Sequence, residues 1–148
     1  MTPEEIKQSL KLFIVLSRAH KAITETTNQF FQKSGVNPTE FAVLELLYHK
    51  GRQPLQKIGS KILLASGSIT YVVDKLEQRG FLARVSCPSD RRVTYAEITE
   101  AGIAFMAEIF PQHEAHLFEL LSALSMEEKD EAITLLKKLG LSIKDLSY

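Results

Sequence analysis

The chain of 148 residues lacks tryptophan and has a single cysteine, Cys87. One cysteine cannot form an internal disulfide, and so sparse a use of cysteine is typical of a reducing compartment. The sequence contains no run of the roughly 18 to 20 apolar residues that a transmembrane helix needs. Its first residues also lack the basic and apolar regions of a secretory signal. We therefore expect a cytoplasmic protein that does not enter a membrane.

Motifs for enzymatic chemistry are also absent. The sequence has no phosphate-binding loop, no Gly-x-Ser-x-Gly and no His-Glu-x-x-His, and none of its carboxylate pairs stands apart from helix caps or ordinary surface positions. We predict that the protein is not an enzyme and that it needs no cofactor.

Charge is balanced over the whole chain but is unevenly distributed. There are 18 Lys or Arg and 18 Asp or Glu residues. Residues 52–92 hold eight of the basic and three of the acidic residues, a net charge of +5, which leaves −5 for the remainder. A positive segment on a neutral protein is typical of a surface that meets nucleic acid.

The central segment predicts a winged helix-turn-helix. A helix capped by Asn37 precedes a short helix from Pro54 to about Leu63, and a third helix is expected over 66–80, with Ser66 as its N-cap and Gly80 at its end. Its apolar residues recur at helical spacing, which leaves one polar face available. The β-branched runs 81–85 and 93–98 then flank a basic turn, as in a β-hairpin.

The two ends of the chain predict long helices. One is expected from a cap at Thr2 to about Lys33, another from a cap at Thr99 through Pro111, and a last one from Ser125 to Gly140. Their apolar stripes are too extensive to be buried on one winged helix. We therefore predict a mainly α fold with a small β-wing, in which 35–102 form the winged helix-turn-helix and 1–34 with 103–148 form a helical dimerisation layer.

Two segments resemble the MarR family of bacterial transcriptional regulators. Asp90-Arg91-Arg92, followed after five residues by Ile98-Thr99-Glu100-Ala101-Gly102, is similar to the D-x-R-x5-[LI]-T-x-x-G wing signature of that family. The segment 70–82 resembles its recognition helix, with Tyr71 where many members have arginine. The resemblance covers essentially the whole chain and implies a homodimer that binds a pseudo-palindromic duplex operator, more often as a repressor than as an activator.

The resemblance also implies the residues that contact DNA. Near the start of the recognition helix, Thr70 and Tyr71 would face base edges and adjacent phosphates, with Gly67 permitting close approach, and a wing-tip arginine would enter the minor groove. Asp90 is expected to orient Arg92 and leave Arg91 as the probe, although the two roles can be exchanged. The predicted contacts are Gln56, Lys57, Ser66, Gly67, Ser68, Thr70, Tyr71, Lys75, Asp90, Arg91 and Arg92.

Several features suggest a signal that releases the DNA. Members of the family often bind small aromatic ligands, and a cavity beside the dimerisation layer is predicted to be lined by Phe13, Leu16, Ser17, His20 and Phe41. His20 is alternatively a histidine of the core. Cys87 is either incidental or an oxidant sensor. His113 and His116, with Glu114 nearby, suggest a metal-responsive regulator, but two further zinc ligands cannot be assigned, so no metal site is predicted.

A winged helix can also serve protein contact without DNA binding. The two functions differ in salt dependence, because only DNA binding releases counterions from phosphates. Binding that weakens steeply with salt, and weakens further in an Arg92→Ala variant, is expected for the DNA-binding protein alone.

Overall fold

The computed structural model describes residues 1–62 and 68–144, and it divides into two compact units, Met1–Gln112 and His113–Tyr148. The predicted contacts Ser66 and Gly67 lie outside the described residues. Within the described ranges, no helix is long and apolar enough to cross a membrane.

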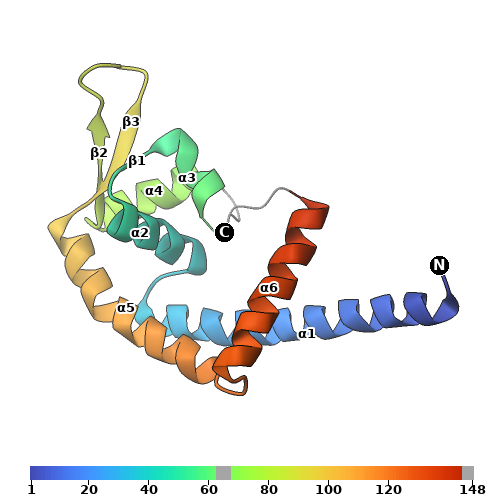
Figure 1. The fold of residues 1–148 in the computed structure, drawn as a ribbon. Coiled ribbons are helices and arrows are strands. Elements are labelled where there is room, and N and C mark those ends of the chain that lie inside the picture. The colour runs from blue at the N-terminus through green and yellow to red at the C-terminus, as the bar shows by residue number, and fades with distance from the viewer. Residues whose placement is uncertain (63–67, 145–148) are drawn as a thin grey trace. The chain divides into compact units, whose positions relative to one another are not determined.

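Helix α1 spans Pro3–Ser34 and has the length that the sequence predicts. Thr2 and Glu5 form a capping box, in which the Thr2 hydroxyl accepts from the Glu5 amide and the Glu5 carboxylate accepts from the Thr2 amide. Gly35 ends the helix with a φ of 81°, a left-handed conformation that glycine adopts without a steric penalty. Figure 1 shows α1 extending away from the winged helix, so its first turns have nothing from that domain to pack against.

Three shorter helices form the helix-turn-helix and its support. Helix α2 spans Pro38–Lys50, α3 spans Leu55–Lys61 and α4 spans Ile69–Gln78. The predicted cap Asn37 is present at the start of α2, where it forms a capping box with Glu40. The start predicted for α4 is wrong: the helix begins at Ile69, and Ser68 rather than Ser66 is its N-cap, with its hydroxyl accepting from the Tyr71 amide.

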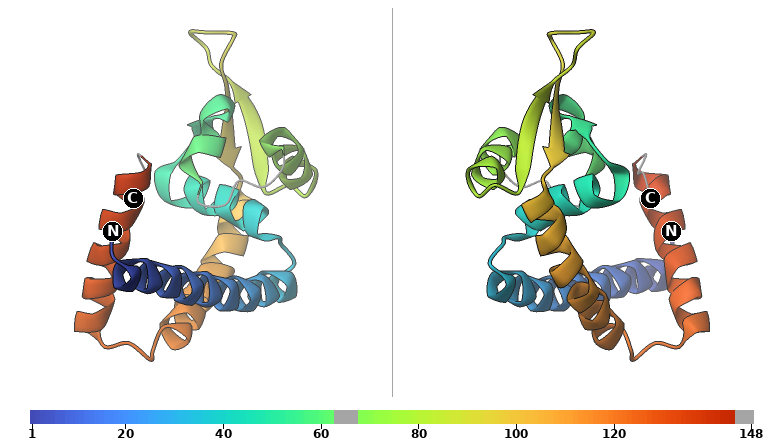
Figure 2. Two further views of the ribbon diagram at one scale, coloured as in Figure 1. Left: turned by 90° about the vertical axis from the view of Figure 1, so that its right-hand side faces the viewer. Right: turned by 90° about the vertical axis from the view of Figure 1, so that its left-hand side faces the viewer.

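The wing is a hairpin of β2 (Leu82–Ser86) and β3 (Thr94–Ile98), paired antiparallel from Leu82 opposite Ile98 to Ser86 opposite Thr94. Both views of Figure 2 show it projecting beyond the neighbouring helices. A two-residue strand, β1 (Gln53–Pro54), adds to the free side of β3, which gives the sheet order β1-β3-β2. The sequence did not predict β1.

One hydrophobic core holds the winged helix together. It combines the buried side of α2 and α4 with residues from the end of α1, from the sheet and from the first half of α5 (Glu100–Leu120). Its largest fully buried side chains are Leu44, Leu47, Ile58, Leu76, Leu82, Met106, Val43 and Val73. The exposed face of α4 is thus carried on a helix whose opposite face is fixed in the core.

The second unit contains the end of α5 and helix α6 (Met126–Ile143), which follows the predicted start Ser125; Ser125 is its N-cap and forms a capping box with Glu128. The described part of α6 has no buried residue. Helix α6 ends at Ile143, later than the predicted Gly140, and α5 continues through Pro111 as predicted.

Candidate nucleic-acid interface

Helix α4 has one face in the core and one in solvent. Val72, Val73 and Leu76 are buried, whereas Thr70, Tyr71 and Lys75 are exposed. The Lys75 ammonium lies 5.2 Å from the centroid of the Tyr71 ring, a cation–π contact that orients both side chains on the solvent face. These three residues lie within the first two turns of a helix, where backbone amides also attract phosphate.

The end of α4 is fixed to the rest of the domain. Gly80, with a φ of 78°, closes the helix through hydrogen bonds from its amide to the Glu77 carbonyl and from the Phe81 amide to the Leu76 carbonyl. Arg79 forms an ion pair of 3.4 Å with the nearly buried Glu40 and lies 4.8 Å from the centroid of the Phe81 ring. The recognition helix therefore has a defined direction relative to α2.

The wing tip carries two arginines, one of which is bound to a carboxylate. The Arg92 guanidinium donates two hydrogen bonds to the Asp90 carboxylate, and its amide donates a third to Oδ1. These bonds lower the pKa of Asp90, so the pair is formed above that pKa and is lost as the pH falls through it. Asp90 thus orients Arg92, as predicted. Arg91 is exposed and forms no ion pair with the part of the chain that the structure describes.

The short helix α3 contacts the wing through Gln56. Its amide nitrogen lies 3.4 Å from the Arg92 carbonyl oxygen, to which it donates a hydrogen bond. Lys57 is exposed on the same helix. The structure therefore places the described members of the predicted set on three adjoining elements of one domain, α3, α4 and the wing; their role in binding DNA stays a prediction.

Not every basic residue of the positive segment is available to a ligand. Lys61 donates to the Gln53 side chain at 2.7 Å, and Arg52 lies 4.7 Å from the centroid of the Tyr95 ring. Arg84 and Arg79 are bound to carboxylates. Sequence reasoning counted these cations toward the binding surface without detecting their internal partners, because those partners come from other elements.

Cys87 lies where the wing leaves β2, and its sulfur is 3.3 Å from the Ser89 hydroxyl. Hydrogen bonds from the Ser89 side chain and backbone lower the pKa of the thiol. Cys87 is the single cysteine of the sequence, so it has no second thiol with which an internal disulfide could form.

The two histidines of the second unit lie on α5. Burial, and then the charge of neighbouring His116, lower the pKa of His113. No group of three or more His, Cys, Asp or Glu side chains within 1–62 and 68–144 is arranged to hold a metal ion.

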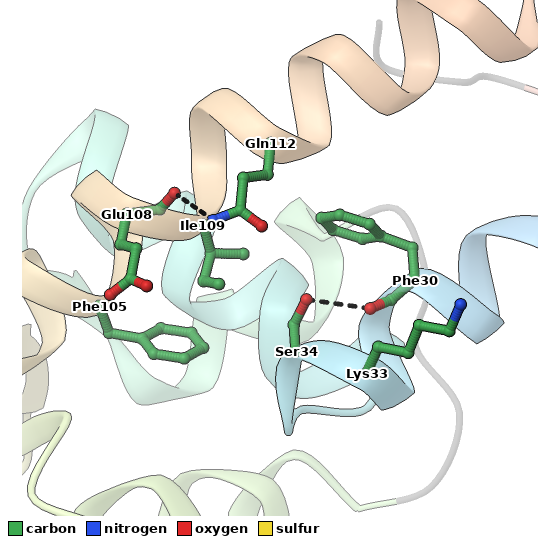
Figure 3. Close-up of a pocket in the computed structure, with 7 residues that line it drawn as sticks. All are labelled: Phe30, Lys33, Ser34, Phe105, Glu108, Ile109 and Gln112. Carbon is green, nitrogen blue, oxygen red and sulfur yellow. Dashed lines mark hydrogen bonds between the residues drawn. The ribbon is translucent and has the colours of Figure 1, made fainter.

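A pocket of about 460 Å³ lies between the end of α1 and the middle of α5. In Figure 3, Phe105 and Ile109 project from α5 toward the Ser34 side of α1. Ser34 and Gln112 are held by hydrogen bonds to carbonyls of their own helices, at 2.9 and 3.3 Å. The lining residues are Phe30, Lys33, Ser34, Phe105, Glu108, Ile109 and Gln112.

None of the five residues predicted to line a ligand cavity belongs to this pocket. Phe41 is buried in the core, with its ring 4.6 Å from that of Phe31, whereas Phe13, Ser17 and His20 are exposed on α1. Leu16 is half-buried. Phe13 precedes Phe31 by roughly 27 Å of helix at 1.5 Å per residue, so within one chain Phe41 and Phe13 cannot line the same cavity. A ligand-binding role for these residues stays a prediction.

A helix-turn-helix followed by a hairpin wing, with an exposed helix face beside basic loops, defines the class of winged helix-turn-helix DNA-binding proteins. Within that class, residues 36–94 match the sequence model of the MarR family. The chain is 61% identical over 138 residues to the HTH-type transcriptional regulator MhqR of Bacillus subtilis (strain 168), covering 93% of this chain and 95% of that protein. The protein belongs to the MarR family and is a transcriptional regulator.

Two further comparisons agree. The transcriptional repressor MprA of Escherichia coli (strain K12) is 31% identical over 136 residues, which cover 89% of this chain and 76% of that protein. The crystal structure of Sco3205, a MarR family regulator from Streptomyces coelicolor in complex with DNA, has the same fold, with a TM-score of 0.81, 18% identity and coverage of 97% and 94%. Because its relatives are transcriptional regulators, the prediction that this protein is not an enzyme is confirmed.

Proposed function

We propose that the protein is a homodimeric repressor that binds a pseudo-palindromic DNA operator and is released from it by a small aromatic ligand. The observation that carries the DNA-binding part is the placement of an exposed recognition face and a cationic wing tip on the same domain. Thr70 and Tyr71 would read base edges, while Lys75, Gln56 and Lys57 would position the phosphate backbone. Arg91 would enter the minor groove. The similarity to MprA, a transcriptional repressor, supports the direction of regulation.

Exposed apolar side chains support the dimer. On α1, Phe13 has 70% and Leu10 has 60% of its surface exposed, which is a costly arrangement for a helix that remains alone in water. The described part of α6 adds further large apolar side chains. A second copy that covers these faces would remove them from water and would place two recognition helices on half-sites about one helical turn apart. The exposed apolar residues of the two helices are Ile6, Leu10, Leu12, Phe13, Ile14, Val15, Ile23, Met126, Ile133, Leu135, Leu136, Leu139, Leu141 and Ile143.

The DNA contacts of the wing are tested by replacing its two arginines one at a time. We expect Arg91→Ala to weaken binding to a duplex selected by the protein from a random library by about 1 to 3 kcal/mol, and to reduce the salt slope by about one. Arg92→Ala should weaken binding as well, because it removes one cation from the wing tip and leaves the Asp90 carboxylate without its guanidinium partner. Titrations at several salt concentrations measure both effects, and a stoichiometry of two chains per duplex is expected.

Lys138→Ala removes an exposed cation from α6 and is the matched control, for which we expect no change in the salt slope. Affinity that is insensitive to salt in the wild type, and equal in all three variants, would contradict DNA binding through the wing and favour the alternative of protein contact.

The pocket between α1 and α5 supports the ligand part of the proposal. Its wall residue Phe105 stacks on Phe81, with ring centroids 4.8 Å apart and an angle of 24° between the rings. Phe81 in turn contacts Arg79 at the end of the recognition helix. A ligand that displaces Phe105 would therefore disturb the residues that fix the direction of α4. A tenfold loss of operator affinity requires a preference of only about 1.4 kcal/mol for the non-binding conformation.

Narrowing the pocket tests this proposal. We expect at least one compound from a panel of salicylate, simple phenols and quinones to weaken binding to the selected duplex about tenfold in the wild type. Gln112→Trp should abolish that response by filling the pocket, whereas Gln32→Trp, at an exposed site on α1 that does not line it, should retain the response. Unchanged affinity across the panel in the wild type contradicts the ligand part of the proposal.

A further inference from the structure

Arg84 joins the wing to the recognition helix. From the middle of β2, its guanidinium forms ion pairs with two carboxylates of α4, Nη2 with Asp74 Oδ1 and Nη1 with Glu77 Oε1 at 2.7 Å. The Arg84 backbone amide also donates to Glu77 Oε2 at 3.2 Å. One residue of the strand therefore binds two successive turns of the helix through both its side chain and its main chain.

These contacts remove Arg84 from the set of cations that can meet DNA. Both terminal nitrogens of the guanidinium are already bound to carboxylates, and 27% of the side-chain surface is exposed. The hydrogen bond to Asp74, and next those to Glu77, raise the pKa of Arg84, so the charge is permanent. A phosphate would have to displace an existing charge-assisted pair to bind here.

The same pairs account for two acidic residues on the helix that reads DNA. Asp74 and Glu77 keep 49% and 41% of their side-chain surface exposed, and free carboxylates at these positions would repel phosphates. The arginine of the wing strand is bound to both carboxylates and balances one of their two negative charges. Binding of the wing through Arg84 would explain why the recognition helix carries Asp74 and Glu77.

We propose that Arg84 is a positioning residue for DNA recognition: its bridge to Asp74 and Glu77 fixes the wing relative to the base-reading face of α4, so that both elements fit one duplex. On the β3 side, the Gln56 amide bound to the Arg92 carbonyl provides a second anchor, from α3. The wing is thus held to both helices of the helix-turn-helix. This inference rests on the proposed contacts of α4 and the wing with DNA.

A double variant distinguishes positioning from simple charge because the two explanations predict opposite signs. Asp74→Asn with Glu77→Gln removes two negative charges near the DNA, so a role for charge alone predicts tighter binding to every duplex. Positioning predicts that the ratio of affinities for a duplex selected by the wild type and a scrambled duplex of equal length falls about tenfold. The affinity for the scrambled duplex should stay equal or rise.

Two further variants complete the experiment. Arg84→Lys keeps the charge but cannot bind both carboxylates in the same fork geometry, and it should also lower the ratio. Glu97→Gln with Glu100→Gln removes two exposed carboxylates that form no ion pair within the described part of the chain, and it should leave the ratio unchanged. Register places Glu97 beside Ala83, so it points to the opposite face of the hairpin from Arg84.

The outcomes are separable. If D74N/E77Q and R84K both keep the wild-type ratio of affinities for the selected and the scrambled duplex, Arg84 has no positioning role, although the protein still binds DNA. A wild-type protein that selects no duplex overturns the proposed function itself. Thermal unfolding of each variant at the same protein concentration shows whether a lowered ratio accompanies a folded domain, and R84K is the milder substitution if the double variant does not fold.

Discussion

Replacing Gly102 by alanine is expected to destabilise the protein by about 2 to 3 kcal/mol, the upper part of the range for overpacking in a rigid core. Gly102 lies in the first turn of α5, where its amide donates to the Thr99 hydroxyl. A Cβ atom at this position would collide with the Phe81 carbonyl oxygen and would lie 2.7 Å from Ile98 Cγ1. The Phe81 carbonyl cannot retreat freely because it also accepts the Thr99 amide. Chemical denaturation measures the change.

A loss of stability in G102A is informative because helix propensity alone would make alanine stabilising at this position. Alanine is favoured over glycine inside a helix by about 1 kcal/mol, so G102A would stabilise the protein if the space were open. Gly80→Ala is the matched control: its Cβ meets no atom within 4 Å, but its φ of 78° is unfavourable for alanine. We expect a cost of only about 1 to 2 kcal/mol there. A G102A protein as stable as the wild type would contradict the close approach of α5 to the α4–β2 turn.

Replacing Leu76 by alanine is expected to lower the free energy of unfolding by about 2 to 5 kcal/mol. Leu76 is fully buried in the core and lies on the inner face of α4, so its truncation leaves a cavity beneath the recognition helix. Thermal and denaturant unfolding, at one protein concentration because of the proposed dimer, measure the loss.

Tyr71→Ala, five residues earlier on the outer face of α4, is the paired comparison. Tyr71 keeps 60% of its surface exposed, so its removal should change stability by no more than about 0.5 kcal/mol. It should instead weaken binding to the selected duplex. If Y71A were as destabilising as L76A, the assignment of the two faces of α4 would be wrong.

Features encoded within a few residues could be predicted from the sequence. The predicted caps Thr2, Asn37 and Ser125 are all present, and each forms a capping box with the glutamate three positions later. The same holds for the wing, since two β-branched runs that flank a basic turn indicate a hairpin directly. Local signals therefore sufficed for the order of the helices and for the winged helix.

The wrong start of α4 and the missed strand β1 have a different origin. Ser66 and Ser68 are both suitable N-caps, and the choice between them depends on how Val72, Val73 and Leu76 pack in the core. Strand β1 has only two residues, one of them proline, and exists through its pairing with β3 far along the chain. Neither fact is contained in the local sequence.

The features of the candidate site also fall into those that local sequence predicts and those that it does not. The exposed face of α4 and the Asp90–Arg92 pair follow from helical spacing and from neighbouring residues. The bridge of Arg84 to Asp74 and the pocket between Phe30 and Phe105 join separate elements, so composition and spacing could not reveal them. The apolar stripe of α1 led to a predicted cavity around Phe13, a side chain that the structure places in solvent.

The pairing of Gln53 with Ala96 has a consequence for how the domain folds. It encloses α3, α4 and β2 in a single long loop, and contacts between residues so distant in sequence form late because the ends of the loop must first meet. The capped helices can begin to form as soon as their residues leave the ribosome. The winged helix-turn-helix is complete only when β3 has been synthesised and inserted between β1 and β2. A nascent chain that ends before residue 94 is therefore not expected to recognise DNA.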